Sequence, residues 1–358
     1  MSRPGTDVHA DQRAEAGPAV PISSLRYVGD CRAAYARATS AAGEVVDRRF
    51  AIGPFEITLR FAGSALADAL WPAFAHLALA PTDARSLTFC VWDGASTGVA
   101  PPALSVPDAA DGMIVRYADA RVRLRREMWG ALSVVDSASA TGFYWAPSPQ
   151  VPEWERAAPM RSALHLALSR RGCHLIHAAA VGIGGTGVLL AGPSGAGKST
   201  AAVACLEAGF EFLGDDFVLV DTTGAPTAHS VYGTAKLGRD ALARLGLPGV
   251  GADSPPVDDD KVVLFVREQR PTQLRRALAI EHVVLPRITD GRAALRAVSA
   301  AEALRVVAPS TIFALSDGSQ ELLATAAELV RLVPCHVLEL GPHPRDAPRL
   351  LEGLIEHG

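Results

Sequence analysis

Residues 192–200, with the sequence GPSGAGKST, decide the fold of the second half of this chain. They follow the P-loop pattern, in which Gly and four further residues precede Gly-Lys-Ser or Gly-Lys-Thr. Glycine lets the backbone form a tight concavity, so that successive N–H groups converge on phosphate oxygens. The pattern therefore predicts that a nucleotide is bound by Gly192, Pro193, Ser194, Gly195, Ala196, Gly197, Lys198, Ser199 and Thr200.

The sequence on either side of the loop supports this prediction. The apolar run at 188–191 predicts a strand before the loop, and residues 199–208 predict a helix after it. Such a helix turns its positive end toward a bound anion. Lys198 supplies a mobile charge for the terminal phosphates, and the hydroxyl of Ser199 is a predicted Mg²⁺ ligand. A chance glycine-rich turn would not require this strand and helix.

The size of the chain favours two domains, because 358 residues exceed what one hydrophobic core usually serves. We expect a disordered tail at 1–25, a smaller α+β domain at 26–150 and a P-loop domain of the α/β class at 151–358. The composition, 49% apolar and 20% charged, is that of a soluble globular protein. A net charge of −4 gives no general attraction to nucleic acid or to an anionic membrane, so neither partner is expected.

The cysteines indicate the compartment. There are five, they are scattered, and none forms a C-x-x-C pair, so neither a disulfide framework nor a zinc site is predicted. The N-terminus lacks a continuous apolar core, and no segment has 18 apolar residues in a row. We expect neither a signal peptide nor a membrane span, and a reduced, cytoplasmic location fits best.

The first half contains the pattern of a small sheet. Apolar and polar residues alternate at 55–61, which predicts a half-buried strand. The segments that follow predict a helix at 64–79 and strands at 86–92, 113–117, 122–126 and 131–135, the last three as an antiparallel series. Arg121, Arg123 and Arg125 share one strand face. That face is either a solvated basic surface or a docking surface for an acidic peptide.

The second half begins with an expected amphipathic helix at 153–171, stopped by Gly172. Strands are then expected at 173–181 and 187–191, joined by GIGGTG. This sequence matches the dinucleotide pattern G-x-G-x-x-G, but it leads into a strand where that pattern requires a helix, so we interpret it as a hairpin turn. Further strands are expected at 261–266, 280–285, 293–298 and 336–340, and helices at 237–245, 300–307, 319–332 and 344–356.

Two adjacent carboxylates lie close to the loop in sequence. Asp215 and Asp216 follow Lys198 by 17 and 18 residues, after a short predicted strand. Beside a triphosphate, such a pair can hold Mg²⁺ or accept the proton of an attacking hydroxyl, and it could instead cap an exposed turn. His177 lies on the strand that hairpins back into the loop. It is either near the base of the loop or a satisfied core histidine.

Residues 177–216 resemble the catalytic segment of the HPr kinase/phosphorylase family. The resemblance consists of a histidine that begins a β-hairpin, a GxSGxGKS loop, a helix ending in Gly and a strand reaching an Asp-Asp pair. It implies a P-loop kinase fold related to ATP-dependent phosphoenolpyruvate carboxykinase, which phosphorylates a serine hydroxyl on a protein or peptide. It also implies that Asp215 is the general base, that Asp216 and Ser199 lie by the metal, and that His177 supports the acidic pair.

Weaker cues are similar to a divergent group of that family found with bacterial peptide natural products. FCVWDG at 89–94, GFYWAP at 142–147 and LPRIT at 285–289 look like this group. It includes kinases that phosphorylate the C-terminal serine of lasso peptide precursors. The resemblance implies a peptide or protein partner bearing a serine, and the hexamers of the family make self-association an expectation.

Three cations are candidates for a clamp on the transferring phosphoryl group: Lys236, Lys261 and Arg287. Each could instead be a surface charge.

The P-loop and the family resemblance together predict an ATP- and Mg²⁺-dependent serine kinase. Two alternatives stay open, a nucleotide-binding regulator or scaffold without phosphotransfer, and a kinase or carboxykinase-like enzyme acting on a small molecule.

Overall fold

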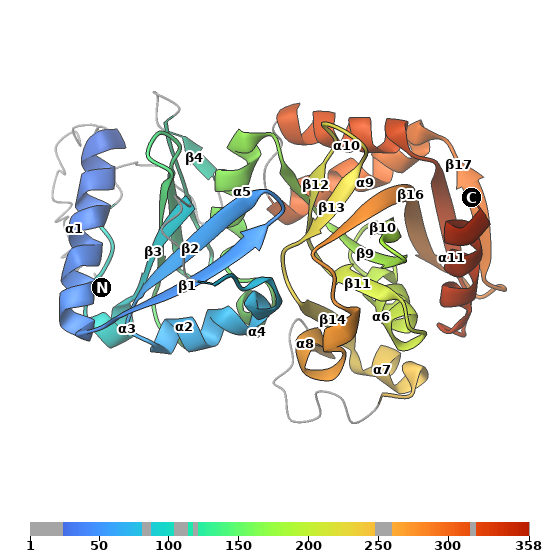
Figure 1. Cartoon of the computed structure of the whole chain (residues 1–358), viewed down its shortest axis with the longest axis horizontal. Coiled ribbons are helices and arrows are strands. Elements are labelled where there is room, and N and C mark those ends of the chain that lie inside the picture. Colours follow the sequence, from blue (N-terminus) through green and yellow to red (C-terminus); the bar gives the residue numbers. More distant parts are fainter. Residues whose placement is uncertain are drawn as a thin grey trace, which may run out of the picture.

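A computed structural model describes residues 24–80, 87–103, 114–116, 121–247, 260–315 and 320–357. It is a mixed α/β structure built on two main sheets (Figure 1). Almost all of the tail expected at 1–25 lies outside the described residues, as do the ends of the strand expected at 113–117. Within the described residues, no helix combines the length and the apolar character that crossing a membrane requires.

Within the residues that the structure describes, the first sheet has seven strands in the order β1-β2-β3-β7-β6-β5-β4. They are β1 (Val45–Ile52), β2 (Phe55–Ala62), β3 (Leu87–Asp93), β4 (Ile114–Arg116), β5 (Val122–Arg126), β6 (Leu132–Asp136) and β7 (Thr141–Ala146). β3 runs parallel to both β2 and β7, and β4, β5 and β6 form the predicted antiparallel series. Helix α1 (Ser24–Ala42) covers one face, where Tyr27 and Cys31 are buried in a cluster with Trp92.

Two expected helices are interrupted, each near a proline. The helix expected at 64–79 ends as α2 (Ala65–Leu70), and short 3-10 turns at Trp71–Ala73 and Ala75–Leu77 follow. Pro72 lies in the first of these turns, and its ring and missing N–H do not suit a helix interior. The helix expected at 153–171 is divided into α4 (Glu153–Ala157), α5 (Arg161–Leu168) and the 3-10 turn Ser169–Arg171.

The break between α4 and α5 has a specific hydrogen-bonded arrangement. Met160 has a left-handed backbone, with φ of 55°. Its N–H donates to the Glu155 carboxylate over 2.8 Å, and the Tyr144 hydroxyl donates to the same oxygen over 2.6 Å. Glu155 is buried, and burial raises its pKa to about 7 even though both bonds act in the opposite direction. The break thus fixes α5 against β7.

The arginine face of β5 is not exposed, which corrects both interpretations of it. Arg123 and Arg125 are 8% and 5% exposed. Arg123 donates to the Ser169 hydroxyl over 3.2 Å, and Arg125 donates to the Leu315 carbonyl at the end of α9 (Ala300–Leu315). Arg121 pairs with Asp136 at 2.7 Å. Arg123 and Arg125 therefore join the first sheet to the second half and are not open to solvent or a peptide, whereas Arg121 is 33% exposed and pairs within the first sheet.

The second sheet carries the P-loop and has nine strands in the described part of the chain. Seven follow the order β11-β9-β10-β16-β13-β12-β8, and β18 pairs with both β16 and β17. The strands are β8 (His174–Ile176), β9 (Ala178–Ile183), β10 (Thr186–Ala191), β11 (Glu211–Gly214), β12 (Val218–Asp221), β13 (Thr227–Ser230), β16 (Ala277–Ile288), β17 (Ala294–Val298) and β18 (Cys335–Leu340). β16 runs parallel to β10 and β18.

The hairpin predicted at GIGGTG is confirmed. β9 and β10 pair antiparallel with Gly182 opposite Gly187. Gly184 and Gly185 form the turn, with φ of 60° and 88°, a conformation that favours glycine. This turn therefore leads from strand to strand and opens no helix.

Helices cover both faces of the second sheet (Figure 1). Val188 and Leu190 pack with α6 (Lys198–Glu207) and α11 (Asp346–His357), whereas Leu189 and Ala191 face the cluster that contains α9 and α10 (Gln320–Leu332). This alternation is the period of two expected for a strand buried on both sides. The same larger cluster extends to Phe50 and Phe74, so the two main sheets share one buried core.

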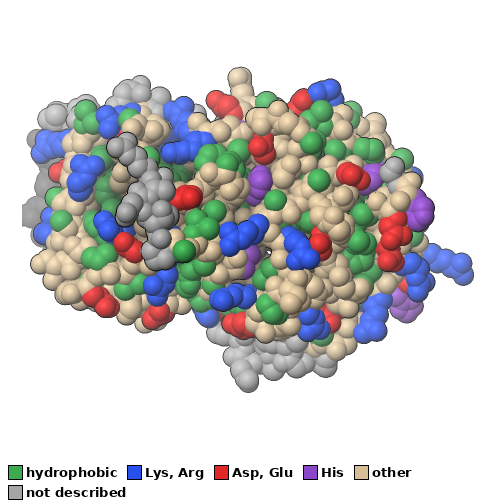
Figure 2. Space-filling view, viewed as in Figure 1, with side chains coloured by type: hydrophobic (Ala, Val, Ile, Leu, Met, Phe, Trp, Pro, Cys, Tyr) green, Lys and Arg blue, Asp and Glu red, His purple; other side chains and the backbone are tan. Residues whose placement is uncertain are grey.

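A two-stranded sheet lies beside the end of the main sheet that carries the loop. It pairs β14 (Thr234–Gly238) with β15 (Lys261–Phe265), and α7 (Arg239–Leu245) and α8 (Val266–Gln269) flank it. Acidic and basic side chains are interspersed over the face of the molecule shown in Figure 2, with several Lys and Arg side chains near its middle.

We predict that Arg125→Ala lowers the free energy of unfolding by about 3 kcal/mol, because it removes a buried guanidinium and leaves the largely enclosed Glu127 without its ion-pair partner at 3.1 Å. The Leu315 carbonyl also loses its donor. Urea denaturation followed by circular dichroism measures the change. The control is Arg126→Ala, one position along the same strand but exposed, for which a loss below about 0.5 kcal/mol is expected. Equal losses in the two variants would contradict a structural role for Arg125.

Candidate functional site

The P-loop connects the end of β10 to the start of α6, as the sequence predicts. β10 ends at Ala191 and α6 begins at Lys198. Gly197 has φ of 99°, and a Cβ placed there would lie 2.5 Å from the Cδ1 atom of Leu340. Glycine is required at this position by both the backbone conformation and the close approach of β18.

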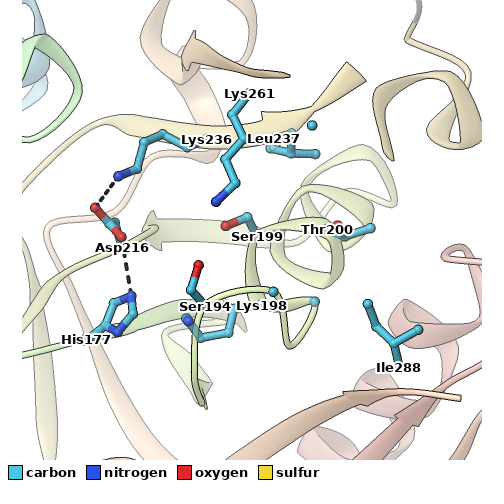
Figure 3. A pocket seen from close by; sticks show the side chains of 13 residues that line it. His177, Ser194, Lys198, Ser199, Thr200, Asp216, Lys236, Leu237, Lys261 and Ile288 are labelled. Carbon is cyan, nitrogen blue, oxygen red and sulfur yellow. Dashed lines mark ion pairs between the residues drawn. The ribbon is translucent and has the colours of Figure 1, made fainter. Parts of the chain in front are cut away.

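The loop borders a cavity that other segments complete (Figure 3). From the loop and the start of α6, the cavity is lined by Ser194, Gly195, Gly197, Lys198, Ser199 and Thr200. Other elements contribute His177, Asp216, Lys236, Leu237, Gly238, Lys261 and Ile288. Gly192, Pro193 and Ala196 belong to the loop without lining the cavity. The structure thus brings together residues that are more than 100 positions apart in the sequence.

Lys198 is held inside the loop. Its ammonium group donates to the carbonyl oxygens of Gly192 over 2.7 Å and Pro193 over 3.1 Å. The side chain is buried, and this burial lowers its pKa, although the nearby Asp215 and Asp216 act in the opposite direction. Carbonyl oxygens of the loop therefore position the cation, and the N–H groups of the same loop would surround a phosphate.

Asp215 lies behind Ser199. Its side chain is 1% exposed and does not line the cavity. The Ser199 hydroxyl donates to one carboxylate oxygen over 2.9 Å, and the backbone N–H of Lys236 donates to the other over 3.0 Å. Burial and the adjacent Asp216 raise the pKa of Asp215, and the two hydrogen bonds oppose that rise. This carboxylate therefore orients Ser199 and has no direct access to a hydroxyl in the cavity.

Asp216 faces the cavity. Its backbone is left-handed, with φ of 71°, and this turns its side chain away from that of Asp215. The carboxylate lies 2.6 Å from the Lys236 ammonium and 3.4 Å from Nε2 of His177, as drawn in Figure 3. Burial alone would raise its pKa, but Lys236 and His177 outweigh burial and hold the pKa well below its usual value. Asp216 is therefore an ionised carboxylate at the cavity wall.

His177 occupies the break between β8 and β9. Its ring lies 5.4 Å from the ring of Phe217, and its Nδ1 atom lies 3.3 Å from the Ser310 carbonyl oxygen. The Arg161 guanidinium lies 5.2 Å from the centroid of the same Phe217 ring. Sequence reasoning singled out His177 but missed Phe217 and Arg161. The position of Phe217 directly after the carboxylate pair is a signal that could have found it. No spacing in the sequence indicates that Arg161 contacts Phe217.

The three predicted clamp residues lie differently. Lys236 and Lys261 line the cavity from β14 and β15. Arg287 is exposed on β16 and does not line it, whereas the next residue, Ile288, does. Successive side chains of a strand point to opposite faces, so only one of these two neighbours can face the loop.

The oxygen ligands at the loop suit a hard divalent cation. Ser199 and Asp216 both line the cavity, and the Asp215 carboxylate fixes the direction of the Ser199 hydroxyl. Mg²⁺ in proteins is usually held by one or two such groups together with waters and substrate phosphates. Within the described residues, no three His, Cys, Asp or Glu side chains gather as a possible metal site.

The similarity of this chain to known proteins is weak. No protein-family model matches this chain, and no curated protein is similar to it in sequence. A solved structure of the HPr(Ser) kinase/phosphatase from Coxiella burnetii aligns with 51% of this chain and 94% of its own, at 11% identity and a TM-score of 0.30. A likeness of this degree supports no argument about function.

We predict that Ser199→Ala lowers the free energy of unfolding by about 1 to 2 kcal/mol at neutral pH, because the buried Asp215 carboxylate loses a hydrogen-bond donor. This hydrogen bond stabilises the ionised carboxylate, and so opposes the rise in the pKa of Asp215 that burial causes. The loss should therefore shrink as the pH falls and Asp215 takes up a proton.

Urea denaturation at neutral and mildly acidic pH tests this expectation. Ser194→Ala is the matched control, because Ser194 lines the same cavity but is exposed, and within the described residues its hydroxyl has no hydrogen-bond partner. A loss for Ser199→Ala that is independent of pH would exclude the bond to Asp215 as its cause.

Proposed function

We propose that this chain is an ATP-dependent kinase that transfers the γ-phosphate to a serine hydroxyl of a peptide or protein. The observation that carries the proposal is the shared cavity of the P-loop and Asp216, in which a phosphate-binding backbone faces an ionised carboxylate. A site that only binds a nucleotide needs the loop but does not need such a carboxylate. Phosphoryl transfer needs both, because the donor must be positioned and the attacking hydroxyl must lose its proton.

The loop and its cations hold the donor in this proposal. The backbone N–H groups of the loop and Lys198 bind the β- and γ-phosphates, with Lys198 exchanging its carbonyl acceptors for phosphate oxygens. Lys261 faces the same space from β15. These charges are fixed before the reaction, so they stabilise the charge of the transferring group without a large rearrangement.

Asp216 takes the acceptor proton in the mechanism that we propose. It lines the cavity, whereas Asp215, the residue that the family resemblance implies as base, is enclosed behind Ser199. A weakly basic carboxylate suits a loose transition state, since it orients the hydroxyl and accepts the proton late. His177 and Lys236 then hold Asp216 in place, and Asp215 positions Ser199.

Ser199 and Asp216 would hold Mg²⁺, which when bound supplies neutralising charge for the donor phosphates. Asp215 contributes indirectly, through its bond to Ser199. Each of these oxygens is already directed by a neighbour within the protein.

The nature of the acceptor rests on the weaker sequence cues. We propose a peptide or protein serine, including the C-terminal serine of a lasso peptide precursor, on the resemblance of FCVWDG and GFYWAP to that group. Both segments belong to the first sheet, in β3 and β7. We therefore propose that residues 26–150 recognise the acceptor and residues 151–358 carry out the transfer.

We predict that Asp216→Asn reduces phosphate transfer by about 10² to 10⁴, the usual contribution of a general base, while ATP binding is largely retained. Lys198→Ala should weaken both binding and transfer. The assay uses γ-labelled ATP with a peptide that ends in serine and the same peptide ending in alanine, and mass spectrometry locates the product. Asp240→Asn, an exposed carboxylate on α7, is the control and should be unchanged.

The outcomes separate the alternatives. ATP binding by the unmodified protein without transfer to any serine peptide would favour a regulator or scaffold. Transfer that is lost in Asp215→Asn but retained in Asp216→Asn would restore Asp215 as the base. Equal transfer to the serine and alanine peptides would reject the terminal serine as acceptor.

We predict that Lys236→Met shifts the acid limb of the pH profile of kcat/KM upward. Lys236 is a principal cause of the low pKa of Asp216, so its removal raises that pKa and Asp216 is protonated at a higher pH. The direction of the shift follows because a carboxylate with a lowered pKa loses its ionised form only when the pH falls through that pKa. Lys261→Met is the control, since Lys261 lines the cavity without pairing with Asp216. An unshifted limb in Lys236→Met would show that Asp216 does not control the profile.

A further inference from the structure

The cavity at the P-loop has two chemically different ends. In Figure 3, His177 and Asp216 lie at one end of the loop, and Thr200 and Ile288 lie at the other. If the γ-phosphate meets Asp216, the order of phosphates along a P-loop places the α-phosphate toward Thr200. The remainder of a bound nucleotide must then leave the loop past Thr200 and Ile288.

A second cavity begins at that end. Gly197, Thr200 and Ile288 line both cavities, so the two are continuous around the start of α6. The second is completed by Arg244 from α7 and by Leu340, Gly341 and Pro344 from the end of β18 and the segment before α11. Arg244, Leu340, Gly341 and Pro344 thus belong to segments that do not line the end of the first cavity where His177 and Asp216 lie.

The walls of the second cavity suit a flat aromatic group. Ile288, Leu340 and Pro344 are apolar, and the Ile288 side chain is 60% exposed although it borders a charged cavity. Arg244 is exposed, and within the described residues its guanidinium has no hydrogen-bond or ion-pair partner. A planar guanidinium stacks on aromatic rings, and apolar side chains can pack on the opposite face of such a ring.

The position of Arg244 is fixed by the C-terminal end of α7. Gly246 ends that helix in a left-handed conformation, with φ of 78°. Arg345 then donates to the Leu245 carbonyl over 3.0 Å, which ties the end of α7 to the segment before α11. Arg244 on α7 and Pro344 before α11 consequently border one cavity, and the bond between Arg345 and Leu245 links their two segments.

We propose that this second cavity binds the nucleoside of the donor nucleotide, with its base stacked on Arg244 and packed against Ile288, Leu340 and Pro344. The proposal rests on the proposed function, because it takes the cavity at the P-loop as the site of the phosphates. It deepens that function by naming the residues that hold the nucleoside of the donor, with Arg244 as the residue that selects it over a bare polyphosphate.

Isothermal titration with two Mg²⁺-loaded ligands, ATP and inorganic tripolyphosphate, tests the proposal. The unmodified protein should bind ATP more tightly than tripolyphosphate. Arg244→Ala should weaken ATP binding by about tenfold, the scale of one stacking contact, and leave tripolyphosphate binding unchanged. Arg244→Lys should behave like Arg244→Ala, because lysine keeps the charge but loses the planar surface.

The control variants distinguish the proposal from the function on which it rests. Arg349→Ala, an exposed arginine on α11 outside both cavities, should bind both ligands normally. Unchanged ATP binding in Arg244→Ala, with both ligands lost in Lys198→Ala, would overturn the nucleoside site and leave the phosphate site intact. Weaker binding of both ligands in Arg244→Ala, restored by Arg244→Lys, would make Arg244 a phosphate ligand and also overturn the proposal. Absence of binding of either ligand to the unmodified protein would reject the proposed function itself.

Discussion

Lys236 contacts both carboxylates of the site and so holds them in different environments. Its backbone N–H donates to Asp215 over 3.0 Å, and its ammonium group lies 2.6 Å from Asp216. Two adjacent carboxylates that shared one environment would repel each other, and one would take up a proton. Here burial and the neighbouring Asp216 raise the pKa of Asp215, whereas Lys236 and His177 lower the pKa of Asp216. The division of roles at the site depends on this arrangement.

The charge balance of the cavity follows from the same arrangement. Lys236 and Asp216 neutralise each other at one wall, whereas Lys198 is surrounded by loop carbonyls and Lys261 faces the cavity from β15. Burial lowers the pKa of Lys198, and the two carboxylates oppose that effect. An incoming polyphosphate would meet cations whose positions are set by backbone bonds and strand pairing. Such preorganisation lowers the reorganisation needed when charge develops during transfer.

The features that the sequence predicts are those decided within a few residues. The P-loop and the turn at Gly184 and Gly185 need only their own glycines and the strand and helix beside them. The spacing of Asp215 and Asp216 places both near the loop, but it does not tell which one faces the cavity. That depends on the φ of Asp216 and on the contacts of the two carboxylates with Lys236 and His177, which are distant in sequence.

Features that depend on what covers a surface are the ones that sequence reasoning misses. Alternation correctly groups Arg121, Arg123 and Arg125 on one face, but only the packing of the 3-10 turn at 169–171 and of α9 shows that this face is covered. The contacts of Phe217 with Arg161 and His177 likewise join segments with no shared pattern. Long-range contacts of this kind override local propensity, because burial contributes more to the free energy of folding than a local preference does.

The two ends of the cavity are built by separate elements that meet at Gly197. β14, β15 and the segment between β11 and β12 supply the charged end, whereas β16 and β18 supply Ile288 and Leu340 at the apolar end. A Cβ at Gly197 would lie 2.5 Å from the Cδ1 atom of Leu340, so the missing side chain at Gly197 lets β18 pack close against the loop. This packing fixes the position of the loop relative to β18. It also fixes the point at which a donor nucleotide would pass from the charged end to the apolar end. Changes in α7 can then alter the fit of the donor without moving Asp216, because that carboxylate is held from the opposite side by His177 and Lys236.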